Sequence, residues 1–360
     1  MDTPFGQPGE TAPWNGPAQM LECIAVEPET PDVATFSFRA ADHGWFRYAP
    51  GQFVTLELPV GPEPLLRTYT LSSTPSRPLS VSVTVKAQPG SVGSRWMFEH
   101  VTVGTRLRAH GPFGGFSLHH HPAERYLFIS AGSGVTPMMS MVRWLHDLRS
   151  RADAVLVNCA KRPSDLIFRG ELEQISARCP GIRLAWVVGE PDPGAAWTGY
   201  RGRLSAPMLS LTAPDLARRE AFCCGPEGFM RDVRGMLAAA GLDMSRYHEE
   251  SFHPPEVEAD GAAPADGTQQ PDVVESRVLF KEAGIEAVCA ADETILQVAR
   301  ANGLFIASGC QSGFCGTCKV RCLSGQTKMS HNGGIDDDEI AEGYVLACCT
   351  RPLGYVELAA

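Results

Sequence analysis

Hydrophobic residues follow three patterns along the chain, and the first predicts a barrel. From residue 20 to about 119 the apolar runs are short, partly alternating and separated by turn residues, at 21–26, 35–38, 52–58, 68–71 and 79–86. Short strands divided by turns in this way are typical of an antiparallel β-barrel.

From about residue 125 the pattern changes to strands that alternate with helices. The apolar runs predict strands at 126–130, 154–159, 183–188 and 221–224, with helices at 138–149, 166–178 and 229–240. Alternation of this kind predicts an α/β domain with a doubly wound parallel sheet.

Between residues 253 and 274 the chain has almost nothing to bury, and its Pro, Gly, Ala, Asp, Glu and Gln content predicts a linker. The first 18 residues, rich in Gly and Pro, predict a flexible tail. A chain of 360 residues is long for one core. We therefore expect a multidomain protein with a tail (1–18), a barrel (19–122), an α/β domain (123–253), a linker (254–274) and a C-terminal domain (275–360).

Composition narrows the class of protein. Hydrophobic residues make up 44% of the chain and charged residues 20%, as in ordinary globular proteins. The net charge of -10 argues against a nucleic-acid partner, because phosphate binding draws on a basic surface. No apolar run reaches the roughly 20 residues of a membrane span, and the first residues lack the pattern of a signal peptide. We expect a cytoplasmic enzyme with no membrane partner.

The cysteines carry the most specific chemical signal. Cys310, Cys315 and Cys318 have the spacing C-x4-C-x2-C, and Cys348 follows after 29 intervening residues. This spacing is typical of plant-type [2Fe-2S] ferredoxins, in which one glycine-rich loop brings three thiolates to the two irons and the fourth returns from elsewhere. The alternative is a zinc site, which favours paired C-x2-C elements, and the sequence has one such pair.

The segments 308–318 and 343–348 together resemble a plant-type ferredoxin domain. The resemblance implies an α+β, β-grasp fold for the C-terminal domain. It also implies that the cluster ligands are Cys310, Cys315, Cys318 and Cys348.

A second motif points to a flavin. The segment Arg67-Thr-Tyr69-Thr70-Leu-Ser72 follows a barrel strand and is similar to the R-x-Y-[ST] motif of the ferredoxin reductase superfamily. The resemblance implies FAD, with FMN as the alternative: arginine neutralises the pyrophosphate, tyrosine packs on the isoalloxazine, and the Thr70 hydroxyl acts near N5. A helix expected at 92–100 would offer its N-H groups to the other phosphate edge. The expected flavin-binding residues are Arg67, Tyr69, Thr70, Ser72, Thr84, Val85, Lys86, Val92, Gly93 and Ser94.

A glycine turn predicts the nicotinamide site. Gly132-Ser-Gly134-Val135-Thr136-Pro137 follows the first parallel strand, where a pyrophosphate can sit on a helix N-terminus; a turn with no ligand is the alternative. It resembles the nicotinamide motif of the same superfamily, and Cys224-Gly225-Pro226 resembles the second such motif. By that resemblance Cys224 lies beside the nicotinamide ring as a catalytic residue, with an inert buried cysteine as the alternative.

Domain order and two further segments indicate a group within the superfamily. Residues 248–252 and 331–335 resemble reductase subunits of glycine betaine or stachydrine Rieske monooxygenases, and next the NADH reductase of hybrid-cluster protein. In such relatives an aromatic residue at the end of the second domain stacks on the flavin, which suggests Phe252; a plain core phenylalanine is the alternative. The expected partner is a Rieske-type terminal oxygenase.

Three alternatives stay open. The acceptor could be a hybrid-cluster protein, or the chain could be a redox sensor that binds both cofactors without turnover. A ferredoxin-dependent reductase that runs backwards is the third, and the fused ferredoxin domain argues against it. The resemblance favours NADH as donor, yet Lys161 and Arg162 after the second parallel strand could also hold the 2′-phosphate of NADPH.

Overall fold

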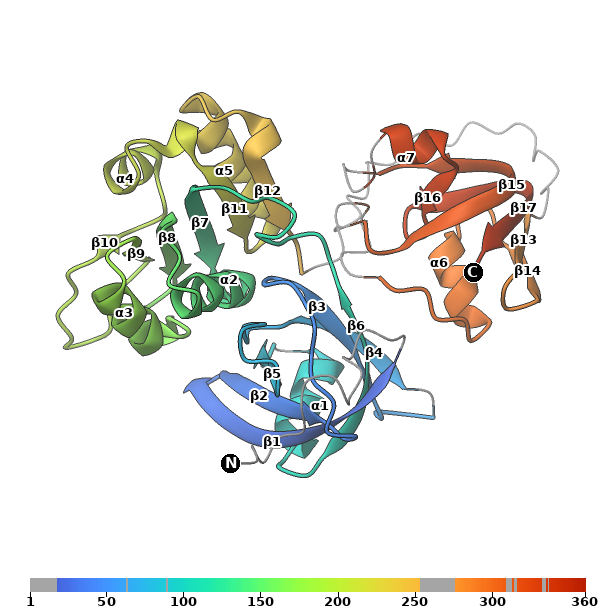
Figure 1. Cartoon of the computed structure of the whole chain (residues 1–360), viewed down its shortest axis with the longest axis horizontal. Helices are drawn as coiled ribbons and strands as arrows, with labels where there is room; N and C mark the ends of the chain where they lie inside the picture. The colour runs from blue at the N-terminus through green and yellow to red at the C-terminus, as the bar shows by residue number, and fades with distance from the viewer. Residues whose placement is uncertain are drawn as a thin grey trace, which may run out of the picture. The chain divides into compact units, whose positions relative to one another are not determined.

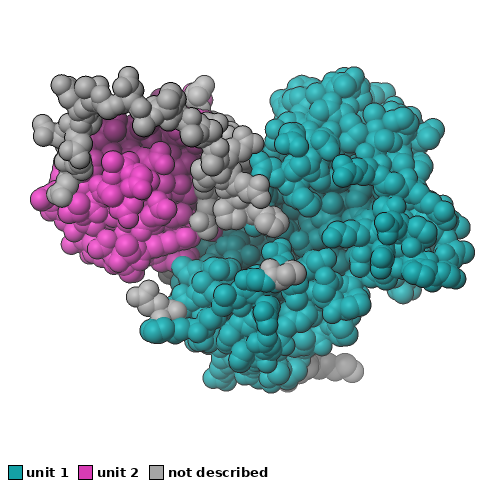
Figure 2. All heavy atoms as spheres, turned by 180° about the vertical axis from the view of Figure 1, so that it is seen from behind, with its two compact units in different colours: residues 1–252 teal, residues 253–360 magenta. Residues whose placement is uncertain are grey.

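The computed structural model describes residues 18–62, 64–88, 90–252, 276–308, 313, 316–331, 335 and 337–360. The chain divides into two compact units, 1–252 and 253–360, which Figure 2 shows in teal and magenta. The first unit contains both the barrel and the α/β domain.

The barrel is a six-stranded antiparallel sheet in the order β4-β3-β6-β1-β2-β5 (Figure 1). An antiparallel bridge between Leu71 and Val83 joins the two outer strands, so the sheet closes. Alternate residues point inward to one apolar core, in which Phe36, Leu56 and Val83 are almost fully buried. The strands are β1 (Gln19–Thr30), β2 (Val33–Ala40), β3 (Phe53–Leu58), β4 (Leu65–Thr70), β5 (Val81–Lys86) and β6 (Arg106–Phe113), with helix α1 (Val92–His100) after β5.

The α/β domain has a parallel sheet in the order β10-β9-β8-β7-β11-β12, with apolar cores on both faces. Its strands are β7 (Arg125–Ala131), β8 (Asp153–Ala160), β9 (Ile182–Val188), β10 (Tyr200–Arg201), β11 (Glu220–Cys224) and β12 (Tyr247–Glu250). Its helices are α2 (Val135–Asp147), α3 (Arg169–Arg178), α4 (Ala206–Thr212) and α5 (Glu227–Ala239), and its short 3-10 turns are η1 (Gly132–Gly134), η2 (Pro163–Asp165), η3 (Leu216–Arg218) and η4 (Met244–Arg246).

Helix α2 joins the barrel to the α/β domain. Ser140 Oγ donates to the Ser73 carbonyl at 2.6 Å, and Arg143 donates to the Ser72 carbonyl at 2.6 Å. One turn further on, Asp147 accepts two hydrogen bonds from the Arg77 guanidinium at 2.8 Å. The helix that begins at the glycine turn is therefore fastened to the segment that follows the flavin motif.

The second unit is a five-stranded mixed sheet in the order β14-β13-β17-β15-β16, packed around one core with helix α6. Its elements are β13 (Ser276–Phe280), β14 (Ile285–Cys289), α6 (Ile295–Ala301), β15 (Lys319–Met329), α7 (Asp337–Ala341), β16 (Tyr344–Leu346) and β17 (Thr350–Ala359). The expected α+β C-terminal domain is confirmed, as are the barrel and the doubly wound domain.

Candidate flavin, nicotinamide and iron-sulfur sites

Arg67 lies over the first turn of α1. A Cβ added to Gly93 would stand 2.8 Å from Cγ of Arg67 and 3.1 Å from its Nε, so a larger residue at position 93 would displace this side chain. Ser91 caps the helix by accepting from the Ser94 N-H, and the first turn carries no acidic residue. An exposed guanidinium beside a helix N-terminus suits an anionic diphosphate, so the first turn (Val92, Gly93 and Ser94) and Arg67 fit the pyrophosphate of FAD.

Tyr69 and Thr70 stand at the end of β4, as the motif requires. Thr70 is 6% exposed and pairs with Phe53 of β3. Burial raises the pKa of Tyr69 to about 12, although the charge of Arg67 opposes the shift. The tyrosine therefore stays neutral, and its ring packs partly against the barrel core.

Ser72 and Thr84 belong to a row of hydroxyl groups that sequence reasoning did not identify. The Ser72 and Thr84 hydroxyl oxygens lie 2.8 Å apart, and Thr84 lies 2.8 Å from Thr35. Thr35 in turn donates to the Glu29 carboxylate at 2.6 Å. Val85 and Lys86, also predicted to bind the flavin, lie in different environments. Val85 is buried in the barrel core, whereas Lys86 forms an ion pair with Asp32 at 3.1 Å.

The two nicotinamide motifs, some ninety residues apart in sequence, lie against each other. A Cβ on Gly134 would stand 2.2 Å from the Cys224 carbonyl oxygen and 2.8 Å from the Gly225 nitrogen. Gly132 adopts a left-handed φ of 56°, and the Thr136 hydroxyl donates to the Ser133 carbonyl at 3.0 Å, which fixes the turn at the start of α2. The close approach leaves a backbone cradle at a helix N-terminus, the arrangement that a dinucleotide needs.

Cys224 is fully buried at the end of β11 and belongs to the same apolar core as Val135 at the start of α2. Burial, and next the charge of Glu250 on β12, raise the pKa of its thiol well above the ordinary value. The thiol is therefore neutral and not a thiolate nucleophile. Pro226 then caps α5, so Cys224, Gly225 and Pro226 form a strand-to-helix turn next to the first one.

Two of the four expected cluster ligands lie together in the second unit. Cys318 and Cys348 are 3% and 8% exposed, and the Cys348 N-H donates to the Cys318 sulfur at 3.4 Å. The Cys349 thiol donates instead to the Leu346 carbonyl at 3.6 Å. Cys310 and Cys315 lie outside the described residues. A buried cysteine sulfur that accepts from the backbone N-H of a second expected ligand fits an iron-sulfur cluster.

The structure places Phe252 at the end of the first unit, with 41% of its surface exposed. The histidines of residues 119–121 lie in the turn after β6. His121 stacks on His248 with ring centroids 3.5 Å apart and 19° between the planes, and His248 bonds Glu220 at 2.6 Å. One ligand atom from each of His121, Glu220 and His248 lies within 4.8 Å of the others, and the ring stacking and the hydrogen bond to Glu220 pack the three side chains together.

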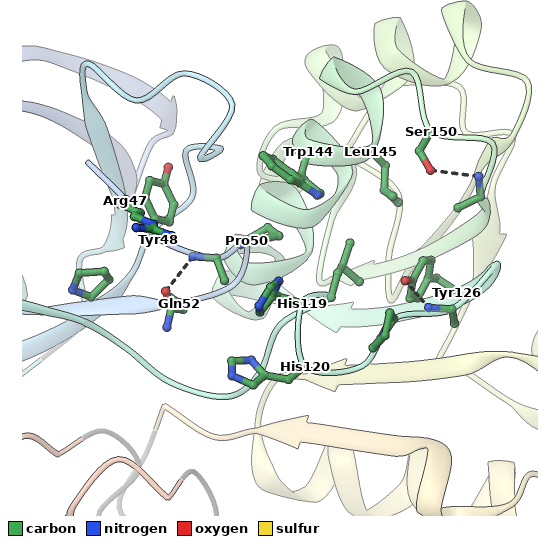
Figure 3. A pocket seen from close by; sticks show the side chains of 16 residues that line it. Arg47, Tyr48, Pro50, Gln52, His119, His120, Tyr126, Trp144, Leu145 and Ser150 are labelled. Atoms are coloured by element: carbon green, nitrogen blue, oxygen red, sulfur yellow. Dashed lines mark hydrogen bonds between the residues drawn. The ribbon is translucent and has the colours of Figure 1, made fainter. Parts of the chain in front are cut away.

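A pocket of about 750 Å³ lies elsewhere in the first unit, between α2 and the barrel loop before β3 (Figure 3). Arg47, Pro50, His119 and Trp144 are among its lining residues. None of the expected flavin or nicotinamide residues lines it. The cofactor motifs therefore define the site, and this pocket does not.

Three family models match the chain in the same order as these sites. The oxidoreductase FAD-binding domain matches residues 21–118, the oxidoreductase NAD-binding domain matches 128–235, and the 2Fe-2S iron-sulfur cluster binding domain matches 280–353.

Similar proteins extend the match to nearly the whole chain. The stachydrine N-demethylase reductase subunit of Rhizobium meliloti is 51% identical over 349 residues, which cover 95% of this chain and 97% of that protein. A glycine betaine monooxygenase reductase subunit of Pseudomonas aeruginosa is 43% identical over 99% of each chain. The chain belongs to the ferredoxin reductase superfamily.

Within that superfamily, more distant matches agree on architecture. The NADH oxidoreductase HCR of Escherichia coli is 31% identical over 98% of this chain and 99% of its own. The crystal structure of phthalate dioxygenase reductase has the same fold, with a TM-score of 0.60 at 22% identity over 95% of this chain and 98% of that chain.

This member of the superfamily is an NADH-dependent flavin and iron-sulfur oxidoreductase, with FAD and a [2Fe-2S] cluster as cofactors. The two most similar relatives named above are reductase subunits of a stachydrine N-demethylase and of a glycine betaine monooxygenase. Among the described residues no helix is both long and apolar enough to cross a membrane.

Proposed function

We propose that the chain takes hydride from NADH and delivers electrons to a Rieske-type monooxygenase that demethylates a quaternary ammonium compound such as stachydrine or glycine betaine. The observation that carries this proposal is the 51% identity, over 95% of the chain, with a stachydrine N-demethylase reductase subunit. The glycine betaine monooxygenase reductase subunits at 42–43% identity support the same substrate class.

A hydride carries two electrons, whereas an iron-sulfur centre accepts one electron at a time. When bound, the flavin accepts a hydride and releases its electrons singly, which an iron-sulfur centre can accept. We propose that Arg67 and the first turn of α1 bind the pyrophosphate, that Tyr69 packs on the ring, and that Thr70 acts at its reacting edge. Gly134 and Cys224 would place the nicotinamide, and Phe252 would cover the flavin.

The four cysteines would then hold the cluster. Cys318 and Cys348 already lie in contact, and the spacing of Cys310 and Cys315 completes the set. Electrons would pass from the first unit to the second and on to the oxygenase.

Reconstitution tests the acceptor. The purified reductase, with FAD and cluster loaded, is mixed with NADH and a quaternary-ammonium Rieske oxygenase, and the demethylated product is measured. We expect product formation that depends on NADH, the reductase and the substrate together. A hybrid-cluster protein serves as the competing acceptor, because an NADH oxidoreductase of that name is 31% identical to the chain.

Faster reduction of the hybrid-cluster protein than of the oxygenase, at equal reductase, would refute the proposed partner. Absence of NADH-dependent dye reduction would instead support a sensor that does not turn over. Initial rates with NADH and NADPH complete the test, since Arg162 lies 3.8 Å from Glu190, whose charge would repel a 2′-phosphate.

A further inference from the structure

The barrel contains a continuous path for a proton between the flavin motif and a partly exposed carboxylate. We propose that Glu29, acting through the hydroxyls of Thr35, Thr84 and Ser72, removes the proton that remains at the flavin site after each hydride has given up its electrons. The proposal rests on the reductase activity and not on the identity of the oxygenase.

Three consecutive hydrogen bonds form the path. The distances are 2.8 Å from Ser72 Oγ to Thr84 Oγ1, 2.8 Å from Thr84 to Thr35, and 2.6 Å from Thr35 to Glu29 Oε1. Each lies in the range of a good O-H···O hydrogen bond. The path runs from Ser72, which follows β4, across β5 and β2 to Glu29 on β1, and its three hydroxyl-bearing residues are at most 6% exposed.

The bonds have one consistent direction. An ionised carboxylate only accepts, so Thr35 must direct its proton to Glu29. The Thr35 oxygen is then available to accept from Thr84, and Thr84 to accept from Ser72. Ser72 has an alternative acceptor in the Ser82 carbonyl, but at the longer distance of 3.2 Å. The row is thus oriented to pass a proton from Ser72 toward Glu29.

The row lies on the outer face of the barrel, on the side of the α/β domain. Val83 and Val85 point into the barrel core, so Thr84 between them points outward. Val33 on the adjoining strand packs into the α/β core, and Arg143 of α2 reaches the Ser72 carbonyl. The hydroxyls are therefore covered by protein, where a fixed relay replaces bulk water.

Glu29 is suited to take up and release a proton. It is half-buried, and burial raises the pKa of its carboxyl above the ordinary value. Thr35 and the charge of Arg143 oppose that shift, while Glu171 and Glu27 add to it. A carboxyl in this setting binds a proton more readily than an exposed one and still reaches solvent.

NADH supplies two electrons and one proton as hydride, and the cluster takes electrons only, so one proton remains per turnover. It binds Ser72 Oγ as the Ser72 proton moves to Thr84, the Thr84 proton to Thr35 and the Thr35 proton to the Glu29 carboxylate. Only O-H bonds are exchanged, and Glu29 then releases the proton to water.

The test uses four variants of the intact holoenzyme. Glu29→Gln keeps a hydrogen-bonding group but takes no proton, and Thr35→Val breaks the path with little change of volume. Thr35→Ser restores a hydroxyl. Ser37→Ala is the matched control, because Ser37 forms a similar 2.9 Å pair with Ser82 across the same two strands but lies outside the path.

Infrared difference spectra of electrochemically reduced minus oxidised protein give a readout that does not depend on turnover. We expect a carboxyl band that shifts in D2O, is lost in Glu29→Gln and Thr35→Val, and is retained in Thr35→Ser and Ser37→Ala. Reoxidation of the reduced flavin by ferricyanide should slow roughly 10- to 100-fold in the first two variants, toward the low end for positioned proton transfer.

All variants are compared at equal flavin content, which separates the relay from cofactor loss. Persistence of the carboxyl band in Glu29→Gln would assign it to another acid and overturn the proposal. An equal carboxyl band and an equal rate of flavin reoxidation in Thr35→Val and Ser37→Ala would also overturn the proposal. Neither measurement involves an oxygenase, so failure here is distinct from failure of the proposed acceptor.

Discussion

Gly134 makes the tightest contact in the nicotinamide site, and replacing it with alanine should separate the two motifs. The new Cβ would stand 2.2 Å from the Cys224 carbonyl oxygen and 2.5 Å from its carbon. Ordinary contact begins near 3.4 Å. The neighbours are backbone atoms of a buried strand end, so they must move by roughly 1 Å or more.

This displacement should affect both the stability of the fold and the rate of hydride transfer. Overpacking of a tight site typically costs about 1–3 kcal/mol of folding free energy. A misplacement of about 1 Å in a reacting pair can cost on the order of 100-fold in rate, or roughly 2.7 kcal/mol in barrier. We therefore expect Gly134→Ala to bind FAD normally but to be reduced by NADH on the order of 100-fold more slowly.

Stopped-flow measurement of flavin bleaching after mixing with NADH is the assay, at several NADH concentrations so that binding and hydride transfer are separated. Gly132→Ala tests backbone strain alone, because Gly132 has a φ of 56° but open space around it. Gly170→Ala, with open space and no left-handed φ, should change nothing. Reduction of Gly134→Ala at the wild-type rate would show that this contact does not position the nicotinamide.

Three further predictions concern the other sites. Arg67→Ala should lose FAD occupancy, measured by flavin absorbance, because a charge-assisted hydrogen bond is worth about 1.5–3 kcal/mol. Cys348→Ser should lose or alter the cluster in visible and paramagnetic resonance spectra, whereas Cys349→Ser should keep it. Burial lowers the pKa of His121 from 6.5 to about 4. Between pH 6.5 and pH 4 the unfolded chain therefore binds a proton at this histidine that the folded chain does not bind. The free energy of unfolding should fall as the pH drops through this range. Denaturant titrations at several pH values should show this loss in the wild type and in His119→Phe, but not in His121→Phe.

Periodic apolar segments were predictable from sequence, and polar elements were not. Helix α1 begins and ends where expected, at Val92 and His100. Helix α2 begins at Val135, three residues earlier than expected, because Pro137 lies in the first turn, where its missing N-H costs nothing. Helix α3 begins later, at Arg169, because Phe168 has a left-handed φ of 59°.

Strand β12 has the sequence Tyr-His-Glu-Glu, which carries no apolar alternation, and only its pairing with β11 makes it a strand. The sequence also does not show that Glu250 lies opposite Cys224, because only the pairing of β11 with β12 brings its charge close to the thiol. The cysteine pair shows a further limit. Cys348 and Cys349 lie in a turn, so the different directions of their side chains do not come from the alternation of a strand.

The anchoring of α2 restricts how these proteins can be recombined. Its N-terminal end carries the glycine turn, and its Ser140, Arg143 and Asp147 hold the barrel segment 72–77 by hydrogen bonds. In a chimera that joins a barrel from one reductase to a nicotinamide domain from another, the partners of these hydrogen bonds would come from two different parents. Exchange of the nicotinamide domain should therefore succeed when segment 72–77 and α2 come from the same parent. A crossover placed only at the loop between β6 and β7 should give a protein in which both domains fold but hydride transfer between them is slow.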